Sequence, residues 1–372
     1  MPAIPLPENA SIEHLRNQAK LVRKLVVAGD AGALDLIREF HPRFAEVTSS
    51  SPPVSFKLAD AQMAIARLYG QSSWSRLREQ LGLLDAHTRP DPADVDEGSD
   101  LPSRFVALAC VSYNGDHDPG ERIAQAQALH RRDPGLAGAS IAALAVAGDH
   151  RQLAERIAQD PSLVNTPCGP NLWPPLLYCC FSRLDLDATT RSTVRTARLL
   201  LDAGADPNAG FLWRGLVPPF TALTGAFGRG EADQPPHPAA FELARALLEA
   251  GADPNDGQAL YNNGLAGTAV DDPGHLVLLV EFGLGIDRNG PWYQRFGRRL
   301  TSPAELLYDE LEVAAHRNLP NRMRFLVDLG LDLERPVGRS RRTPRELAED
   351  AGNVDVLAVL AAAGVTGPDA PR

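Results

Sequence analysis

The chain has 372 residues, of which 44% are hydrophobic, a fraction typical of a protein that buries a core. It has no run of about eighteen apolar residues, and its N-terminus lacks the basic start and apolar stretch of a signal peptide, so we expect a cytoplasmic protein with no membrane partner. The formal net charge of −10 argues against nucleic acid as a partner, because non-specific binding to nucleic acid needs a basic face.

The first predicted element is a helical module in residues 1–84. Its second half carries apolar side chains at helical spacing, namely Ala61, Ile65, Leu68, Tyr69, Trp74 and Leu77. Tyr69 and Trp74 could form a platform for a ligand, but core packing in a small helical module is the favoured interpretation. Residues 85–102 follow as an acidic, proline-containing segment without periodicity, which predicts a linker or a long surface loop.

A sequence string recurs through residues 103–366. It reads LLDAGADPN at residues 200–208 and LLEAGADPN at residues 247–255, and weaker copies follow. The copies can be aligned on one glycine each, which gives Gly204, Gly251, Gly283, Gly330 and Gly364. The intervals are 47, 32, 47 and 34 residues, so two lie close to 33 and two contain about fourteen extra residues.

Each copy predicts the end of a helix and a turn. Paired leucines one turn before the glycine form an apolar helix face, and glycine stops the helix because it tolerates a positive φ. The Asp-Pro-Asn that follows is turn chemistry. In several copies, another helix comes earlier in the chain and opens with proline, as in Thr343-Pro344, Ser302-Pro303 and the segment at Pro175.

These features resemble the ankyrin repeat family. The residues that carry the resemblance are the two GADPN strings and, in the last unit, Thr343, Pro344, Leu347, Ala348 and Gly352. The resemblance implies an all-α ankyrin-repeat solenoid of about six repeats in residues 103–366, with extended β-hairpin fingers and a tail at 367–372. Residues 1–84, with L-A-D-A-Q, Y-G and S-W, resemble an N-terminal module of bacterial ankyrin proteins and would form a helical cap.

Catalytic motifs are missing from the sequence. There is no phosphate-binding glycine loop, no nucleophile elbow, no H-E-x-x-H and no C-x-x-C, so we predict no catalytic residue and no cofactor. Three groups could hold a metal: Asp116-His117-Asp118, Asp185 with Asp187, and the cysteines Cys168, Cys179 and Cys180. A polar turn, a solvated helix end and core packing explain them better, so no metal is predicted, and the adjacent cysteines indicate no disulfide framework.

Two insertions, after Asn208 and after Asp287, would extend two fingers. They are rich in aromatic residues and arginine, with Phe211, Trp213, Arg214 and Phe220 in the first and Trp292, Tyr293, Arg295, Phe296, Arg298 and Arg299 in the second. Such residues dominate binding hot spots, although packing of one finger on the other is an open alternative. A third insertion, from Gly228, predicts a solvated loop in which His237 has no particular role.

We therefore hypothesise a binding module that recognises a protein or peptide, acidic segments included, through the concave ankyrin surface and the fingers. The candidate binding residues are Trp173, Tyr178, Trp213, Arg214, Phe220, Trp292, Tyr293, Arg295, Arg298 and Tyr308. The alternative is a small-molecule-binding protein or an enzyme whose long fingers close a pocket over the groove. In that case Arg295, Asp309 or His316 would supply polar groups to an aromatic pocket.

Overall fold

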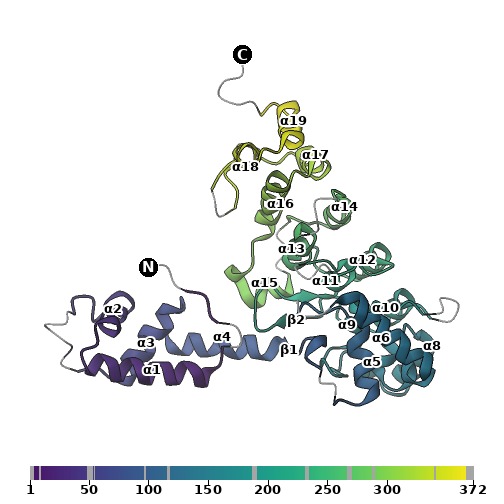
Figure 1. Cartoon of the computed structure of the whole chain (residues 1–372), viewed down its shortest axis with the longest axis horizontal. Helices are drawn as coiled ribbons and strands as arrows, with labels where there is room; N and C mark the ends of the chain where they lie inside the picture. The colour runs from purple at the N-terminus through teal and green to yellow at the C-terminus, as the bar shows by residue number, and fades with distance from the viewer. Residues whose placement is uncertain are drawn as a thin grey trace. The chain divides into compact units, whose positions relative to one another are not determined.

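The computed structural model describes residues 4–7, 10–47, 53, 55–95, 98–114, 118–186, 191–230, 234–265, 270–286, 290–338 and 341–365 (Figure 1). It is mostly helical with one small sheet, which agrees with the predicted all-α class. The chain divides into two compact units, which we call unit 1 (Met1–Thr88 and Leu212–Leu216) and unit 2 (Arg89–Phe211 and Val217–Arg372). Within the described ranges, no helix combines the length and the apolar character needed to cross a membrane.

Unit 1 is built around four helices, α1 (Ile12–Val27), α2 (Ala31–Phe40), α3 (Leu58–Leu68) and α4 (Trp74–His87). Helix α3 packs on the other three, and its core includes the fully buried side chains Leu15, Leu34, Ile37, Ile65 and Leu77. Tyr69 and Trp74 are half-buried and pack against this core. The interpretation of these two aromatic residues as packing groups is confirmed.

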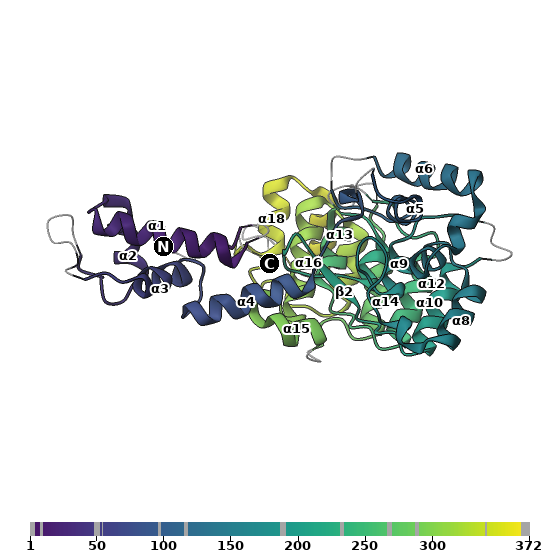
Figure 2. The same ribbon diagram turned by 90° about the horizontal axis from the view of Figure 1, so that it is seen from below.

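Unit 2 contains consecutive helix pairs (Figures 1 and 2). The pairs are α5 (Leu101–Ala109) and α6 (Pro119–Arg132), α7 (Ile141–Val146) and α8 (His150–Gln159), α9 (Pro175–Phe181) and α10 (Thr193–Asp202), α11 (Ala222–Phe227) and α12 (Ala240–Glu249), α13 (Gly257–Leu265) and α14 (Gly274–Glu281), α16 (Pro303–Arg317) and α17 (Pro320–Asp328), and α18 (Pro344–Ala351) and α19 (Val354–Ala362). Short 3₁₀ turns lie at Pro92–Asp94 (η1), Pro134–Gly138 (η2), Pro161–Val164 (η3) and Gly297–Arg299 (η4).

The first helices of successive pairs pack on one another. Contacts run from α5 to α7 and on through α9, α11, α13 and α16 to α18. Second helices also touch, as in α8 with α10, α10 with α12, and α17 with α19. Helix α7 (IAALAV) is made largely of alanine, and small side chains allow helices to approach closely. The core of unit 2 therefore runs along the whole row of first helices.

The five repeated glycines end helices as predicted. Each follows the last turn of a second helix and has a positive φ, for example +91° at Gly204 and +98° at Gly251. Beyond them, asparagine side chains join successive loops. Asn208 Oδ1 accepts from the amide of Asp253 at 2.8 Å, and its Nδ2 donates to the carbonyl oxygen of Gly251 at 3.1 Å. Asn165 and Asn255 make the same kind of paired bond with the loops that follow them.

The two insertions differ in structure. In the first, β2 (Gly210–Trp213) pairs with β3 (Phe220–Thr221) in an antiparallel hairpin with Phe211 opposite Phe220, and β1 (Thr88–Arg89) belongs to the same small sheet. The second folds as helix α15 (Pro291–Phe296) followed by η4, so the prediction of a β-hairpin is wrong there. Pro291 suits a first helical position, and Trp292 and Phe296 lie four residues apart, so both face the core from one side.

Two further segments are more ordered than the sequence indicates. In 85–102, α4 continues to His87, and Asp91 is buried, where it accepts from Ser112 Oγ and from the amide of Tyr113. In the third insertion, His237 is buried and its Nδ1 accepts from the amide of Ala239 at 3.0 Å. The prediction of a solvated loop is therefore wrong for the described part of this insertion.

Candidate functional site

Most of the predicted binding aromatics belong to the core of unit 2. Trp173 and Tyr178 are fully buried, and Trp173 stacks on Phe211 with 4.8 Å between ring centroids. The Tyr178 hydroxyl donates to the carbonyl oxygen of Cys168 at 2.8 Å and accepts from the amide of Asn171 at 3.1 Å. Strand β2 places Phe211 against Trp173, which lies beside Tyr178, so both predicted binding residues are core residues here and their contact with a partner stays a prediction.

Phe220 and Trp292 are also buried. Phe220 lies between Phe211 and Tyr113, with ring centroids 5.7 and 4.6 Å away. The Trp292 indole N–H donates to the carbonyl oxygen of Asn208 at 2.9 Å. A Cβ atom at Gly210 would come within 3.0 Å of the Trp292 ring and 2.8 Å of the Phe220 carbonyl oxygen, so only glycine fits beneath the indole. The second insertion therefore packs on the first, as the packing alternative predicts, and the binding role of these two residues stays a prediction.

One tyrosine and three arginines of the second insertion reach the surface. Tyr293 is half-buried, and Arg295, Arg298 and Arg299 are exposed. We call these four residues the α15–η4 face. Arg295 lies over the Trp292 ring with 4.9 Å from its guanidinium carbon to the centroid, a cation–π contact that restricts the exposed side chain. The buried Trp292 and Phe296 therefore fix the helix from which the tyrosine and the arginines project.

Tyr308 lies on α16 apart from this cluster and is half-buried. The Arg335 guanidinium carbon lies 4.0 Å from its ring centroid, and Arg335 also forms an ion pair with Glu305. Asp309, the neighbour of Tyr308, is partly buried near Glu312 and Glu305. Burial, reinforced by these two carboxylates, raises the pKa of Asp309 to about 6. Tyr308 thus has one face covered by an arginine, and His316 is exposed near the end of the same helix.

Trp213 and Arg214 belong to unit 1. Both side chains are half-buried, and the Arg214 guanidinium carbon lies 4.5 Å from the Trp213 ring centroid. The φ of Arg214 is +50°, a conformation that non-glycine residues adopt rarely. The Arg214 guanidinium therefore covers one face of the neighbouring indole within unit 1.

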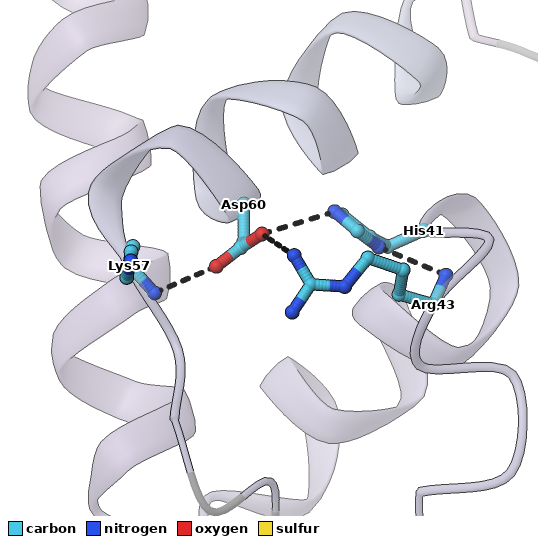
Figure 3. Close-up of polar contacts among 4 residues, drawn as sticks. All are labelled: His41, Arg43, Lys57 and Asp60. Carbon is cyan, nitrogen blue, oxygen red and sulfur yellow. Dashed lines mark hydrogen bonds and ion pairs between the residues drawn. The ribbon is translucent and has the colours of Figure 1, made fainter.

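A second polar cluster in unit 1 connects α2 to α3 (Figure 3). The Asp60 carboxylate accepts from the Lys57 amide at 2.8 Å, pairs with Arg43 Nη1 at 3.2 Å, and lies 3.6 Å from His41 Nε2. His41 Nδ1 accepts from the amide of Arg43, and burial lowers the pKa of the imidazole despite the nearby Asp60. With His41 buried and the Asp60 carboxylate bonded to the Lys57 amide and to Arg43, this cluster anchors the start of α3.

Among the described metal candidates, Asp118 and two of the cysteines have structural roles, whereas Asp185 is exposed and Cys168 is half-buried. Asp118 caps α6 by accepting from the amide of Glu121 at 3.1 Å, while Asp116, His117 and Asp187 lie outside the described residues. Cys179 and Cys180 are fully buried, and burial raises the pKa of both thiols, which confirms their packing role. In the part of the chain that the structure covers, no group of three or more metal-ligating side chains comes together.

One feature of unit 2 has no counterpart in the sequence motifs. A cavity of about 450 Å³ is lined by residues that include Arg229, His275 and Arg322, which are spread over almost a hundred residues of chain. These residues form no motif with a regular spacing in the sequence. Their proximity follows from the packing of successive helix pairs, which the sequence alone does not show. Comparison with known proteins adds no candidate residues, because no family model matches the chain and no curated protein matches it.

Proposed function

We propose that residues 103–366 form an ankyrin-type repeat solenoid that serves as a binding scaffold. Three observations support this. Helix pairs follow one another with first helices in contact, glycines of positive φ end the second helices, and asparagine side chains bridge successive loops. Repeat arrays of this kind present an extended surface to a partner. We also expect the chain to act in the cytoplasm, as its sequence indicates.

We infer that the partner is a protein or peptide with an acidic segment and that it binds the α15–η4 face. The observation that carries this is the exposure of Arg295 on α15, which Trp292 anchors, and of Arg298 on η4, which follows α15 directly. A preorganised arginine loses less conformational entropy on binding, and its planar fork matches a carboxylate. Tyr293 beside the arginines adds apolar contact area of the kind found at hot spots.

The test uses the full-length chain and peptides selected on it from a display library. We expect acidic peptides to be enriched, and fluorescence anisotropy to show that Arg295→Glu/Arg298→Glu weakens them at least tenfold. The matched control is Arg131→Glu/Arg132→Glu, an equal charge change at two exposed arginines of α6, which should stay within twofold.

Two outcomes would contradict the proposal. One is selection of peptides without acidic residues. The other is an equal loss of affinity in the α15 variant and in the α6 control, since that would reflect net charge alone. An oligonucleotide of the same charge serves as a competitor, and tighter binding of the oligonucleotide than of the peptide would also count against a protein partner.

A further inference from the structure

The cavity of about 450 Å³ in unit 2 lies where three second helices begin. It is bounded by Arg229 and residues 236–239 between α11 and α12, the first turns of α12 and α14, and Arg322 near the start of α17. Its size falls within the range of sites for small molecules. It shares no residue with the α15–η4 face, so a ligand in this cavity and a partner on that face can be tested separately.

Two buried polar side chains that line the cavity each have one atom without a hydrogen-bond partner among the described residues. His275 is 5% exposed and Arg322 is 1% exposed. Within the described residues, His275 Nε2 and Arg322 Nε have no hydrogen-bond partner. The other nitrogens of Arg322 are occupied, Nη1 by Glu310 Oε2 at 3.3 Å and Nη2 by the carbonyl oxygen of Asn263 at 3.5 Å. Buried polar atoms are normally paired, so two atoms without a partner among the described residues favour a bound group at this part of the wall.

The donor and acceptor roles of these atoms can be assigned. Burial, together with Arg322 and Arg229, lowers the pKa of His275 to about 3, so the ring is neutral. A hydrogen bond between this ring and the backbone of Asp272 raises the pKa slightly, which is the effect of a ring N–H donating to a carbonyl. The remaining nitrogen, Nε2, is then an acceptor, whereas Arg322 Nε–H is a donor.

Positive potential from the backbone adds to that of the arginines. In the first turn of α12 the Ala240 amide donates to the carbonyl oxygen of His237, and no N-cap side chain bonds the amides of Phe241 and Glu242 among the residues described. At α14 the Gly274 amide already donates to Asp272 Oδ1 at 2.9 Å, and Asp272 also lines the cavity, so only the start of α12 is open to an anion. Uncapped amides at a helix start attract an anion. Arg229, in the loop after α11, adds a full positive charge at the cavity. One side of the cavity is therefore suited to a carboxylate.

Aromatic rings make another part of the cavity wall apolar. Phe227 and Phe241 line the cavity in an edge-to-face pair with 6.1 Å between centroids, and the Phe227 and His275 rings are 6.3 Å apart. An apolar ligand body would bury surface against these rings while its polar groups met the histidine and the arginines. This combination selects against purely polar anions such as inorganic phosphate.

We propose that this cavity binds a small hydroxy acid with an apolar side chain. The carboxylate accepts from Arg322 Nε, from Arg229 and from the amides of Phe241 and Glu242 at the start of α12. The hydroxyl donates to His275 Nε2, and the side chain packs on Phe227 and Phe241. No covalent step is involved, so the site is a binding site.

The experiment is isothermal titration of the full chain with three probes that share a benzyl group. They are 3-phenyllactate, 3-phenylpropionate, which lacks the hydroxyl, and 1-phenyl-2-propanol, which lacks the carboxylate. We expect saturable binding of one 3-phenyllactate per chain. It should be about fivefold tighter than 3-phenylpropionate, the effect of one hydrogen bond, and at least tenfold tighter than the alcohol.

Variants at the cavity rim separate recognition from folding. Arg229→Gln should weaken 3-phenyllactate about tenfold, and Glu242→Gln, which removes an exposed carboxylate from the rim, should strengthen it two- to threefold. His275→Phe should abolish the preference for the hydroxylated probe. Arg322→Met would leave Glu310 buried without its ion pair, so it is not used. Failure of 3-phenyllactate to bind, or shifts of the same sign at Arg229 and Glu242, would overturn the proposal.

Discussion

The Trp292 indole nitrogen lies 2.9 Å from the carbonyl oxygen of Asn208, and the two residues are 84 positions apart in the chain. Asn208 directly precedes the hairpin insertion, and Trp292 lies in the helix of the second insertion. The bond therefore ties the two insertions into one packed structure. Because the Trp292 ring also stacks on Phe296 with 5.9 Å between centroids, it holds α15 in place as well.

Removal of this side chain should destabilise unit 2 strongly. We expect Trp292→Ala to lower the free energy of unfolding by about 3 to 5 kcal/mol, because it leaves a cavity over Gly210. Trp292→Phe keeps the ring stack and loses the hydrogen bond, which should cost about 1 to 2 kcal/mol. Urea unfolding monitored by circular dichroism gives both values. The neighbouring half-buried Tyr293→Ala is the control, and a loss there as large as at Trp292 would contradict the packing role.

The asparagine bridges make a separate prediction. Asn208→Ala removes the partner of both the Asp253 amide and the Gly251 carbonyl, so we expect a loss of about 1 to 2 kcal/mol. Asn208→Asp keeps an acceptor for the amide and should lose less. Hydrogen exchange measures the effect locally, since the Asp253 amide should exchange faster in the alanine variant. Unchanged protection of that amide would show that the bridge does not form in solution.

The helix ends could be predicted from the sequence because their cause is local. A glycine that follows an amphipathic helix needs no distant residue to adopt a positive φ, and Gly204 and Gly251 both do so. Proline at the start of α16 and α18 is equally local. These signals located most second helices of unit 2 without knowledge of their packing.

The burial of the aromatic residues could not be predicted in the same way. Whether Trp173 or Trp292 faces solvent depends on which segment covers it, and the covering residues Phe211 and Gly210 lie far away in the chain. The helix at 291–296 is a different case. Proline followed by two aromatic residues four positions apart is a local helical pattern, and it is present in the sequence. The resemblance to the ankyrin family predicts a β-hairpin at this place, which conflicts with that local pattern.

Asp309 should make unit 2 less stable at neutral pH than at acid pH. The pKa of Asp309 is raised to about 6 in the folded chain, so the folded chain holds the carboxyl proton more tightly than the unfolded chain does. The free energy of unfolding is therefore highest below the unfolded pKa near 3.8, and this stabilisation is lost as the pH rises through 6. We expect Asp309→Asn to be more stable than the wild type by about 1 to 2 kcal/mol at pH 7.5, after allowance for solvent screening, and equal to it near pH 4. Urea unfolding at the two pH values tests this. A stability difference that does not change with pH would contradict the raised pKa.

His237 and His275 should make unit 2 sensitive to acid. Both rings are buried, and burial lowers the pKa of each to about 3, with nearby arginines contributing. A depressed folded pKa means that the stability is complete above the unfolded value of about 6.5 and is lost as the pH falls toward 3, because only the unfolded chain takes up the proton. Each residue should therefore contribute about 1.4 kcal/mol per pH unit between roughly pH 6 and pH 4.

Differences between variants isolate these two residues from the carboxyl groups that titrate in the same range. We expect His275→Phe to reduce the slope of unfolding free energy against pH by about 1.4 kcal/mol per unit, and His237→Phe to do the same. The substitution at His237 also removes the contacts with Thr193 and Ala239, so it should lower stability at pH 7, but the change in slope is independent of that loss. Urea unfolding at pH 7, 6, 5 and 4 gives the slopes. Parallel slopes for the wild type and both variants would mean that neither imidazole is held neutral by the fold.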